Sequence, residues 1–135
     1  MDVKIKRDRS GRMRHVVHVG PHSFPVDLAA KEGGDDSGPD PHDLYDSAAG
    51  ACKALTVLWY ANRKQIPVED ITVTVTRDGS GERSGIYRLR TTLEVTGPLT
   101  EEQRQELLKV AGKCPVHKLM TQVTTEIETE LAAAE

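Results

Sequence analysis

Two cysteines, Cys52 and Cys114, are the residues of this chain best suited to covalent chemistry. They stand 62 positions apart (114 minus 52). The first residues, MDVKIKRDRS, lack the apolar stretch of an export signal, so we expect a cytoplasmic protein whose thiols stay reduced. The remaining interpretations of each cysteine are apolar packing, metal ligation and thiol chemistry.

Each cysteine falls at a distinctive place on a predicted helix. Cys114 precedes Pro115, which places its sulfur at a helix amino terminus, where unpaired N–H groups favour a thiolate. Cys52 lies inside a long helix and would need a cation from elsewhere in the fold, most naturally an arginine. A nucleophilic thiol and a resolving thiol together suit peroxide chemistry, in which a sulfenic acid condenses with the second thiol to a disulfide.

A zinc site is the competing interpretation of the same residues. It would use Cys52, Cys114, His117 and a fourth ligand such as His42. Structural zinc sites usually show two close pairs of ligands, and the segment Cys-Pro-Val-His supplies only one pair. His117 follows Cys114 by one helical turn, so it could donate a hydrogen bond to that sulfur, although packing is the favoured role.

Alternating and helical patterns predict an α+β chain that positions these cysteines. Val3 to Lys6, Met13 to Val19 and Phe24 to Leu28 indicate three antiparallel strands, and residues 31–41 indicate a loop. A hairpin over residues 71–95 and a final strand over residues 123–131 complete the predicted strands. With the helices included, the predicted order is β-β-β-α-β-β-α-α-β, as one domain over residues 1–135.

Capping residues mark where the predicted helices begin. Asp40 is the expected N-cap of the first helix, with Pro41 next and Asp43 three residues after the cap, and the helix runs to about Lys64. Thr100 and Gln103 form an expected capping box for the second helix, and Pro115 opens a short third one.

The first helix carries an apolar stripe, which we expect to be buried: Leu44, Ala48, Ala51, Leu55 and Leu58. Small residues around Gly50 should let another backbone approach closely, although glycine costs helix stability of about 1 kcal/mol.

Composition excludes some function classes. The net charge of −3 gives no general attraction to phosphate backbones, so nucleic acid is not an expected partner. No run of 18 apolar residues occurs, so no membrane segment is expected either. Because the chain has only one Phe, one Trp and three Tyr, its core must be thin. We therefore expect some apolar surface to be covered by a second subunit.

Two segments of the sequence resemble the signature regions of the OsmC/Ohr family of organic hydroperoxide reductases, in its OsmC-like branch. They are GGDDSGPDPHDLYDSAAGACKALTVLWYANRK and GPLTEEQRQELLKVAGKCPVHKLM. The likeness covers nearly the whole chain and includes the order of elements. It implies the OsmC-like fold, with antiparallel sheets around a long central helix, in an intertwined homodimer with active sites at the subunit interface.

The resemblance also implies roles for individual residues. Cys52 matches the peroxidatic cysteine and Cys114 the resolving cysteine. An arginine that stabilises the thiolate comes, in the most active members, from the amino-terminal hairpin, which makes Arg12 the first candidate and Arg14 the second. Asp43 or His42 occupies the region of the family's glutamate, and Asp43 has an alternative role in capping the helix.

The function implied is reduction of organic hydroperoxides to alcohols in oxidative stress defence. The reductant would be a dithiol, lipoyl-type or another thiol, and neither a metal nor an organic cofactor is needed. The alternative is a non-catalytic protein of the same fold that binds a small molecule and keeps its cysteines as core packing.

Overall fold

The computed structural model of the protein describes residues 1–134 and divides into two compact units. The amino-terminal unit covers residues 1–47, and the carboxyl-terminal unit begins at Ala48. Helix α1 (Pro41–Lys64) runs from the first unit into the second. The expectation of one domain over residues 1–135 stays a prediction.

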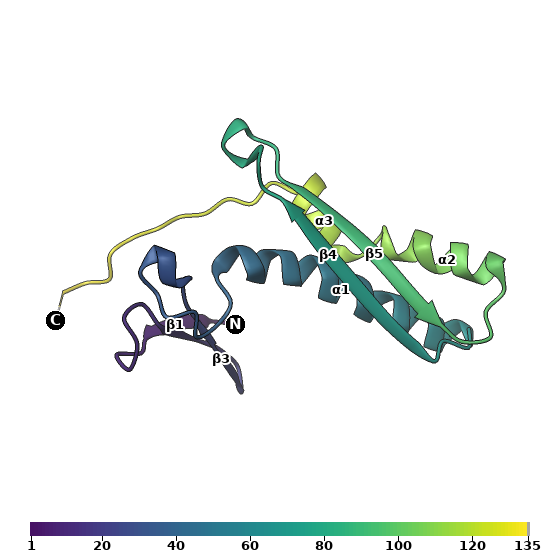
Figure 1. Ribbon diagram of the computed structural model, residues 1–135, viewed down its shortest axis with the longest axis horizontal. Helices are drawn as coiled ribbons and strands as arrows, with labels where there is room; N and C mark the ends of the chain where they lie inside the picture. The colour runs from purple at the N-terminus through teal and green to yellow at the C-terminus, as the bar shows by residue number, and fades with distance from the viewer. Residues whose placement is uncertain (135) are drawn as a thin grey trace. The chain divides into compact units, whose positions relative to one another are not determined.

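Three short antiparallel strands form the sheet of the amino-terminal unit, in the order β1-β2-β3 (Figure 1). They are β1 (Val3–Arg7), β2 (His15–Val19) and β3 (His22–Val26). Val3 pairs with Val19, and Val19 pairs in turn with His22. The tight turn between β2 and β3 places Gly20 at φ +55°, a conformation that glycine adopts without steric cost. The three strands predicted from the sequence are confirmed, with bounds shifted by a few residues.

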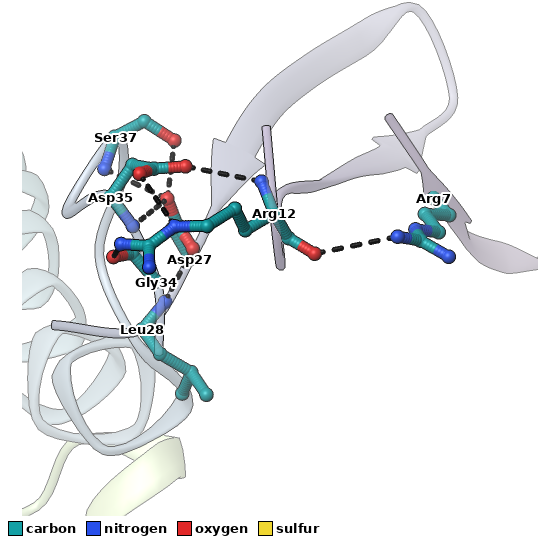
Figure 2. Close-up of polar contacts among 7 residues, drawn as sticks. All are labelled: Arg7, Arg12, Asp27, Leu28, Gly34, Asp35 and Ser37. Carbon is teal, nitrogen blue, oxygen red and sulfur yellow. Dashed lines mark hydrogen bonds and ion pairs between the residues drawn. The ribbon is translucent and has the colours of Figure 1, made fainter. Parts of the chain in front are cut away.

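A buried carboxylate organises the loop that follows β3 (Figure 2). Asp27 accepts hydrogen bonds from the Ser37 hydroxyl (2.6 Å) and from the backbone N–H groups of Ser37 (3.0 Å), Leu28 (2.8 Å) and Asp35 (3.2 Å). The bonds from Ser37, with those from Leu28 and Asp35, outweigh burial and hold the pKa of Asp27 well below its ordinary value. The carboxylate therefore stays ionised and holds the loop in shape. One turn of 3-10 helix, η1 (Ala30–Glu32), lies within this loop.

The carboxyl-terminal unit packs a two-stranded hairpin against helices. Strands β4 (Asp70–Asp78) and β5 (Arg88–Thr96) pair in antiparallel register, with Ile71 opposite Val95 and Val73 opposite Leu93. A short 3-10 turn, η2 (Glu82–Ser84), lies in the connection between the strands. The alternating side chains on one face of the hairpin are half-buried, as the sequence pattern predicted.

The second half of α1 passes behind the hairpin, and helix α2 (Glu101–Ala111) lies on the β5 side of it (Figure 1). The core between them consists of Val57, Ala61, Ile66, Leu107 and Ala111, of which Val57, Ala61 and Leu107 are fully buried. Half-buried Ile71, Leu93 and Val95 of the hairpin pack against it. This core fixes the distance between α1 and α2, and therefore between the segments that carry the two cysteines.

The predicted helix starts are confirmed. Asp43 N–H donates to the Asp40 carboxylate (2.8 Å), and Asp40 N–H donates to the Asp43 carboxylate (3.1 Å). Thr100 and Gln103 form the same reciprocal arrangement at α2. Helix α3 (Pro115–Gln122) begins at Pro115, with Cys114 as its N-cap. Among the described residues, no helix combines the length and apolar content needed to cross a membrane.

The apolar stripe expected to be buried on α1 is not the face that the chain covers. Leu55 is 69% exposed and Leu58 is 37% exposed, and Ala48 and Ala51 are exposed as well. The buried face of α1 in the second unit follows a spacing of four instead: Ala49, Lys53, Val57 and Ala61. The prediction is wrong for the single chain because α1 has two apolar faces, and the hairpin and α2 cover only one of them.

The final strand predicted over residues 123–131 is also wrong for the single chain. Residues 124–134 adopt neither helix nor strand, although apolar and polar side chains alternate along them. Ile127 is 80% exposed and Leu131 is 98% exposed. Alternation predicts a strand only where a neighbouring strand completes the hydrogen-bond ladder, and within residues 1–134 the segment pairs with no strand.

Gly50 lets strand β4 approach α1 closely, as the small residues of this segment predicted. A Cβ atom at Gly50 would lie 2.7 Å from a methyl carbon of Val75. The contact is stiff because a β-branched side chain has few rotamers. Alanine at this position would therefore have two opposing effects: higher helix propensity would stabilise α1, and overpacking against β4 would destabilise the unit.

We predict that Gly50→Ala fails to give the roughly 1 kcal/mol gain expected from helix propensity and instead destabilises by about 1 kcal/mol, because the new methyl clashes with Val75. In the Val75→Ala background the same change should become stabilising, a coupling of about 1 kcal/mol or more. The measurement is a double-mutant cycle by urea unfolding. Gly112→Ala is the matched control, since a Cβ there meets only ordinary contacts. Additive effects of the two substitutions would contradict the proposed contact.

Candidate functional site

The two thiols meet within the carboxyl-terminal unit, where α1 passes the start of α3. Cys52 is half-buried and Cys114 is fully buried, and both are free thiols. A hydrogen bond from Cys114 reaches the Cys52 sulfur. The structure thus brings together the two cysteines that the sequence singled out, through the core that joins α1 to α2.

The amino terminus of α3 serves Cys52 rather than Cys114. The Val116 N–H donates to Cys52 Sγ at 3.5 Å, whereas the Cys114 side chain makes no capping hydrogen bond. Pro115 has no N–H, so Val116 carries the first free donor of this helix. We expected the amino terminus of this helix to stabilise a Cys114 thiolate and to have no effect on Cys52. This expectation is wrong, because the first free N–H of the helix bonds the Cys52 sulfur.

Lys53 supplies a buried positive charge beside both thiols. Its side chain is only 7% exposed. The ammonium donates to the Ala111 carbonyl (3.0 Å) at the end of α2 and contacts His117 Nδ1 at 2.9 Å and Cys114 Sγ at 3.8 Å. A cation is favourable at a helix carboxyl terminus, because the last carbonyls of the helix are unpaired. The lysine therefore links the end of α2 to the start of α3.

Sequence reasoning missed Lys53, although a signal for it exists. Lys53 lies between Ala49 and Val57 at a spacing of four, on the face of α1 that is buried. Lysine is almost never buried unless its charge has a partner. A lysine in the middle of an apolar stripe, directly after a candidate nucleophile, indicates a site residue once the correct face of the helix is known.

His117 hydrogen-bonds Lys53 instead of standing free beside Cys114. Because an ammonium only donates, the 2.9 Å contact suits His117 Nδ1 as the acceptor. Two residues of the alternative zinc site, Cys114 and His117, thus both contact an ammonium. Within residues 1–134, no three His, Cys, Asp or Glu side chains gather closely enough to hold a metal ion.

The surroundings of Cys52 favour its thiolate. Partial burial alone raises the pKa of the Cys52 thiol. Hydrogen bonds from Val116 N–H, the Cys114 thiol and the Thr56 hydroxyl, with the positive charge of Lys53, outweigh burial and lower the Cys52 pKa below its ordinary value. The thiol with the lowered pKa is also the more exposed of the two, which suits a nucleophile.

Arg12 lies in the amino-terminal unit, where it binds the acidic loop. Its guanidinium forms an ion pair with Asp35 (3.1 Å) and donates to the Gly34 carbonyl (2.5 Å), and its backbone N–H also donates to Asp35 (Figure 2). Arg14 pairs with Asp8 at 2.8 Å. A role for Arg12 or Arg14 at Cys52 stays a prediction.

At the start of α1, the Asp43 carboxylate accepts from the Asp40 N–H, and the Asp43 N–H donates to the Asp40 carboxylate. This is the capping role considered from the sequence. It lies in the amino-terminal unit, as does the neighbouring His42. The idea that either residue replaces the glutamate of the resembling family stays a prediction.

A comparison with protein-family models identifies a family for this chain. The model described as "OsmC: OsmC-like protein" matches residues 34–130 of this chain. The matched range contains both cysteines, Lys53 and His117, and it excludes Arg12. No curated protein matches the chain.

Solved structures with a similar fold cover nearly the whole chain. One is a putative osmotic stress induced and detoxification response protein from Psychrobacter arcticus 273-4, with a TM-score of 0.75 and 16% identity, covering 91% of this chain and 90% of that one. An OsmC-like protein from Mycoplasma pneumoniae has a TM-score of 0.71 and 21% identity, covering 90% and 87%. The organic hydroperoxide resistance protein OhrB of Bacillus subtilis has a TM-score of 0.58 and 25% identity, covering 90% of each chain.

We predict that Thr56→Val raises the pKa of Cys52, because it removes a hydroxyl that bonds the sulfur at 3.9 Å while keeping the shape of the side chain. Less thiolate would be present at neutral pH, so alkylation of Cys52 by iodoacetamide should slow there and match the wild type only at high pH. The measurement follows the Cys52 peptide by mass spectrometry across a pH series. Thr72→Val, on the exposed face of β4, is the control. An unchanged or lowered Cys52 pKa in Thr56→Val would rule out the hydroxyl's contribution.

Proposed function

Because the chain belongs to the OsmC-like protein family, we propose that it is a cysteine-based peroxidase that reduces organic hydroperoxides to alcohols. A similar structure, OhrB of Bacillus subtilis, carries the name organic hydroperoxide resistance protein. The observation that carries the proposal is the contact between the half-buried Cys52, whose pKa is lowered, and the buried thiol of Cys114.

The proposed reaction uses the two sulfurs in turn. The Cys52 thiolate attacks the outer oxygen of the hydroperoxide, the O–O bond breaks, and the alkoxide takes a proton and leaves as the alcohol. Cys52 is then a sulfenic acid. The Cys114 thiol condenses with it, which forms the disulfide and releases water. A dithiol, lipoyl-type or another thiol, reduces the disulfide and leaves as its own disulfide.

Arg12 is part of the proposal as a second cation for the Cys52 thiolate, with Arg14 as the alternative. The Arg12 side chain is 62% exposed even while paired with Asp35, so its guanidinium has surface left for another anion. Asp43 would act only indirectly, by fixing the start of α1. A cytoplasmic location would keep both thiols reduced between reaction cycles.

A homodimer is the proposed assembly, and it would cover apolar surface that one chain leaves exposed. On α1 that surface includes Leu55 (69% exposed) and Trp59 (59% exposed), and Arg63 lies 5.0 Å from the centre of the Trp59 ring. The alternating segment 123–131 also needs a neighbouring strand in order to form a ladder. Small cores of this kind often depend on oligomerisation.

We predict that Cys52→Ser lowers consumption of an organic hydroperoxide by about 10³-fold or more, because the attacking thiolate is lost. Cys114→Ser should allow one oxidation of Cys52 per chain and form no internal disulfide. The measurement is hydroperoxide consumption with a dithiol present, together with mass spectrometry of the products. The two variants control for each other, since each replaces one sulfur by oxygen. Intact turnover in Cys52→Ser would refute the proposal, and two free thiols after excess hydroperoxide would favour the non-catalytic binding protein.

The assembly has its own test. We expect a solution mass of twice 14.8 kDa, and we expect Trp59→Glu to weaken the dimer at least about tenfold, because it places a carboxylate in an apolar contact. Light scattering over a dilution series measures both. Ser84→Glu adds the same charge on the exposed turn η2 and should leave the dimer intact. A wild-type monomer at micromolar concentration would remove the proposed dimer.

A further inference from the structure

We propose that Lys53 acts on Cys114 and thereby decides which sulfur the reductant attacks: the dithiol attacks Cys52, and Cys114 leaves as a thiolate held by the Lys53 ammonium. This inference rests on the proposed two-cysteine cycle and deepens it. It assigns Lys53 a part in the reductive half of the reaction.

The geometry separates the two thiols. The Lys53 ammonium contacts Cys114 Sγ at 3.8 Å and is held there by the Ala111 carbonyl and the His117 ring. Cys52 has different partners, namely the Val116 N–H and the Thr56 hydroxyl. The Lys53 ammonium thus contacts Cys114 directly, whereas its charge contributes less to Cys52 than these hydrogen bonds do.

Charge balance explains why Lys53 should favour a Cys114 thiolate. The ammonium is 7% exposed, and neither the carbonyl nor the imidazole that binds it carries a negative charge. A buried charge without a counter-charge is costly, and an anion in contact with it relieves that cost. Cys114 is fully buried, so a negative charge formed on its sulfur when the disulfide opens would have the ammonium as its neighbour. The two charges therefore stabilise each other.

The mechanism of thiol–disulfide exchange explains how this arrangement selects the sulfur that the reductant attacks. A thiolate of the reductant forms a bond to one sulfur of the disulfide, and the other sulfur leaves with the electron pair of the broken S–S bond. The sulfur that leaves carries the negative charge, and on Cys114 that charge would lie in contact with the Lys53 ammonium. The lowered pKa of Cys52 depends in part on a hydrogen bond from the Cys114 thiol, which the disulfide lacks. Cys52 is also the more accessible sulfur. The second thiol of the reductant then attacks the mixed disulfide and releases Cys52, and the two protons of the dithiol end on the protein thiols or on water.

The test traps the mixed disulfide. The full chain is oxidised to the Cys52–Cys114 disulfide with diamide, which is not a peroxide, and is then exposed briefly to glutathione, quenched with acid and alkylated. Mass spectrometry locates the glutathione. We expect at least about tenfold more adduct on Cys52 than on Cys114 in the wild type. Lys53→Met should open the disulfide about tenfold more slowly, with a weaker preference, and Lys53→Arg should restore most of the rate.

Lys109→Met is the control for Lys53→Met. Lys109→Met removes an exposed lysine from the last turn of α2 and should behave as the wild type. Circular dichroism and thermal unfolding establish that each variant is folded. Adduct mainly on wild-type Cys114 would overturn the proposal without any variant. An unchanged rate and preference in folded Lys53→Met would overturn it too, since exposure alone would then explain the direction. Because diamide makes the disulfide, lack of activity toward hydroperoxides would count against the proposed function and not against Lys53.

Discussion

The burial of one lysine ammonium is the constraint on which the arrangement of the two thiols depends. Lys53 comes from the middle of α1 and reaches both the last turn of α2 and the first turn of α3. An ammonium can be buried only where enough acceptors surround it, so the ends of these two helices must lie at a fixed place along α1. The same placement brings Cys114 and the Val116 N–H against Cys52. Packing of Leu107 against Val57 fixes the helices from the apolar side.

Local signals predicted most of the elements correctly. The caps at Asp40, Thr100 and Pro115 depend on hydrogen bonds within a few residues, so sequence alone located the start of every α-helix. The alternation in β4 and β5 worked because both strands belong to one hairpin with a single buried face. The pairing of Cys52 with Cys114 came from the resemblance to a family and from the special place of each cysteine on a helix.

The errors have a common cause. A periodic pattern of apolar residues predicts a helix or strand, but it does not identify the element that packs against it. Helix α1 is apolar on two faces, and only the packing of the hairpin and α2 decides that Val57 is buried while Leu55 is exposed. Residues 123–131 alternate as a strand should, but among the described residues no strand pairs with them. Lys53 was not predicted for the same reason, because it does not lie on the stripe of α1 that was expected to be buried. The contact between the amino terminus of α3 and Cys52 likewise depends on tertiary packing, which the sequence pattern does not show.

The two sulfurs receive stabilisation of different kinds, and the difference suits successive roles. Backbone and hydroxyl donors at Cys52 act in a half-exposed place, where a hydroperoxide or a reductant can arrive. A full positive charge lies in contact with the buried sulfur of Cys114, and it contributes less to Cys52 than the hydrogen bonds there do. Without the ammonium, the buried sulfur would be the poorer leaving group and the disulfide would be harder to reopen. Placing the charge at the buried sulfur therefore serves the return step of the cycle, while the helix terminus serves the attack.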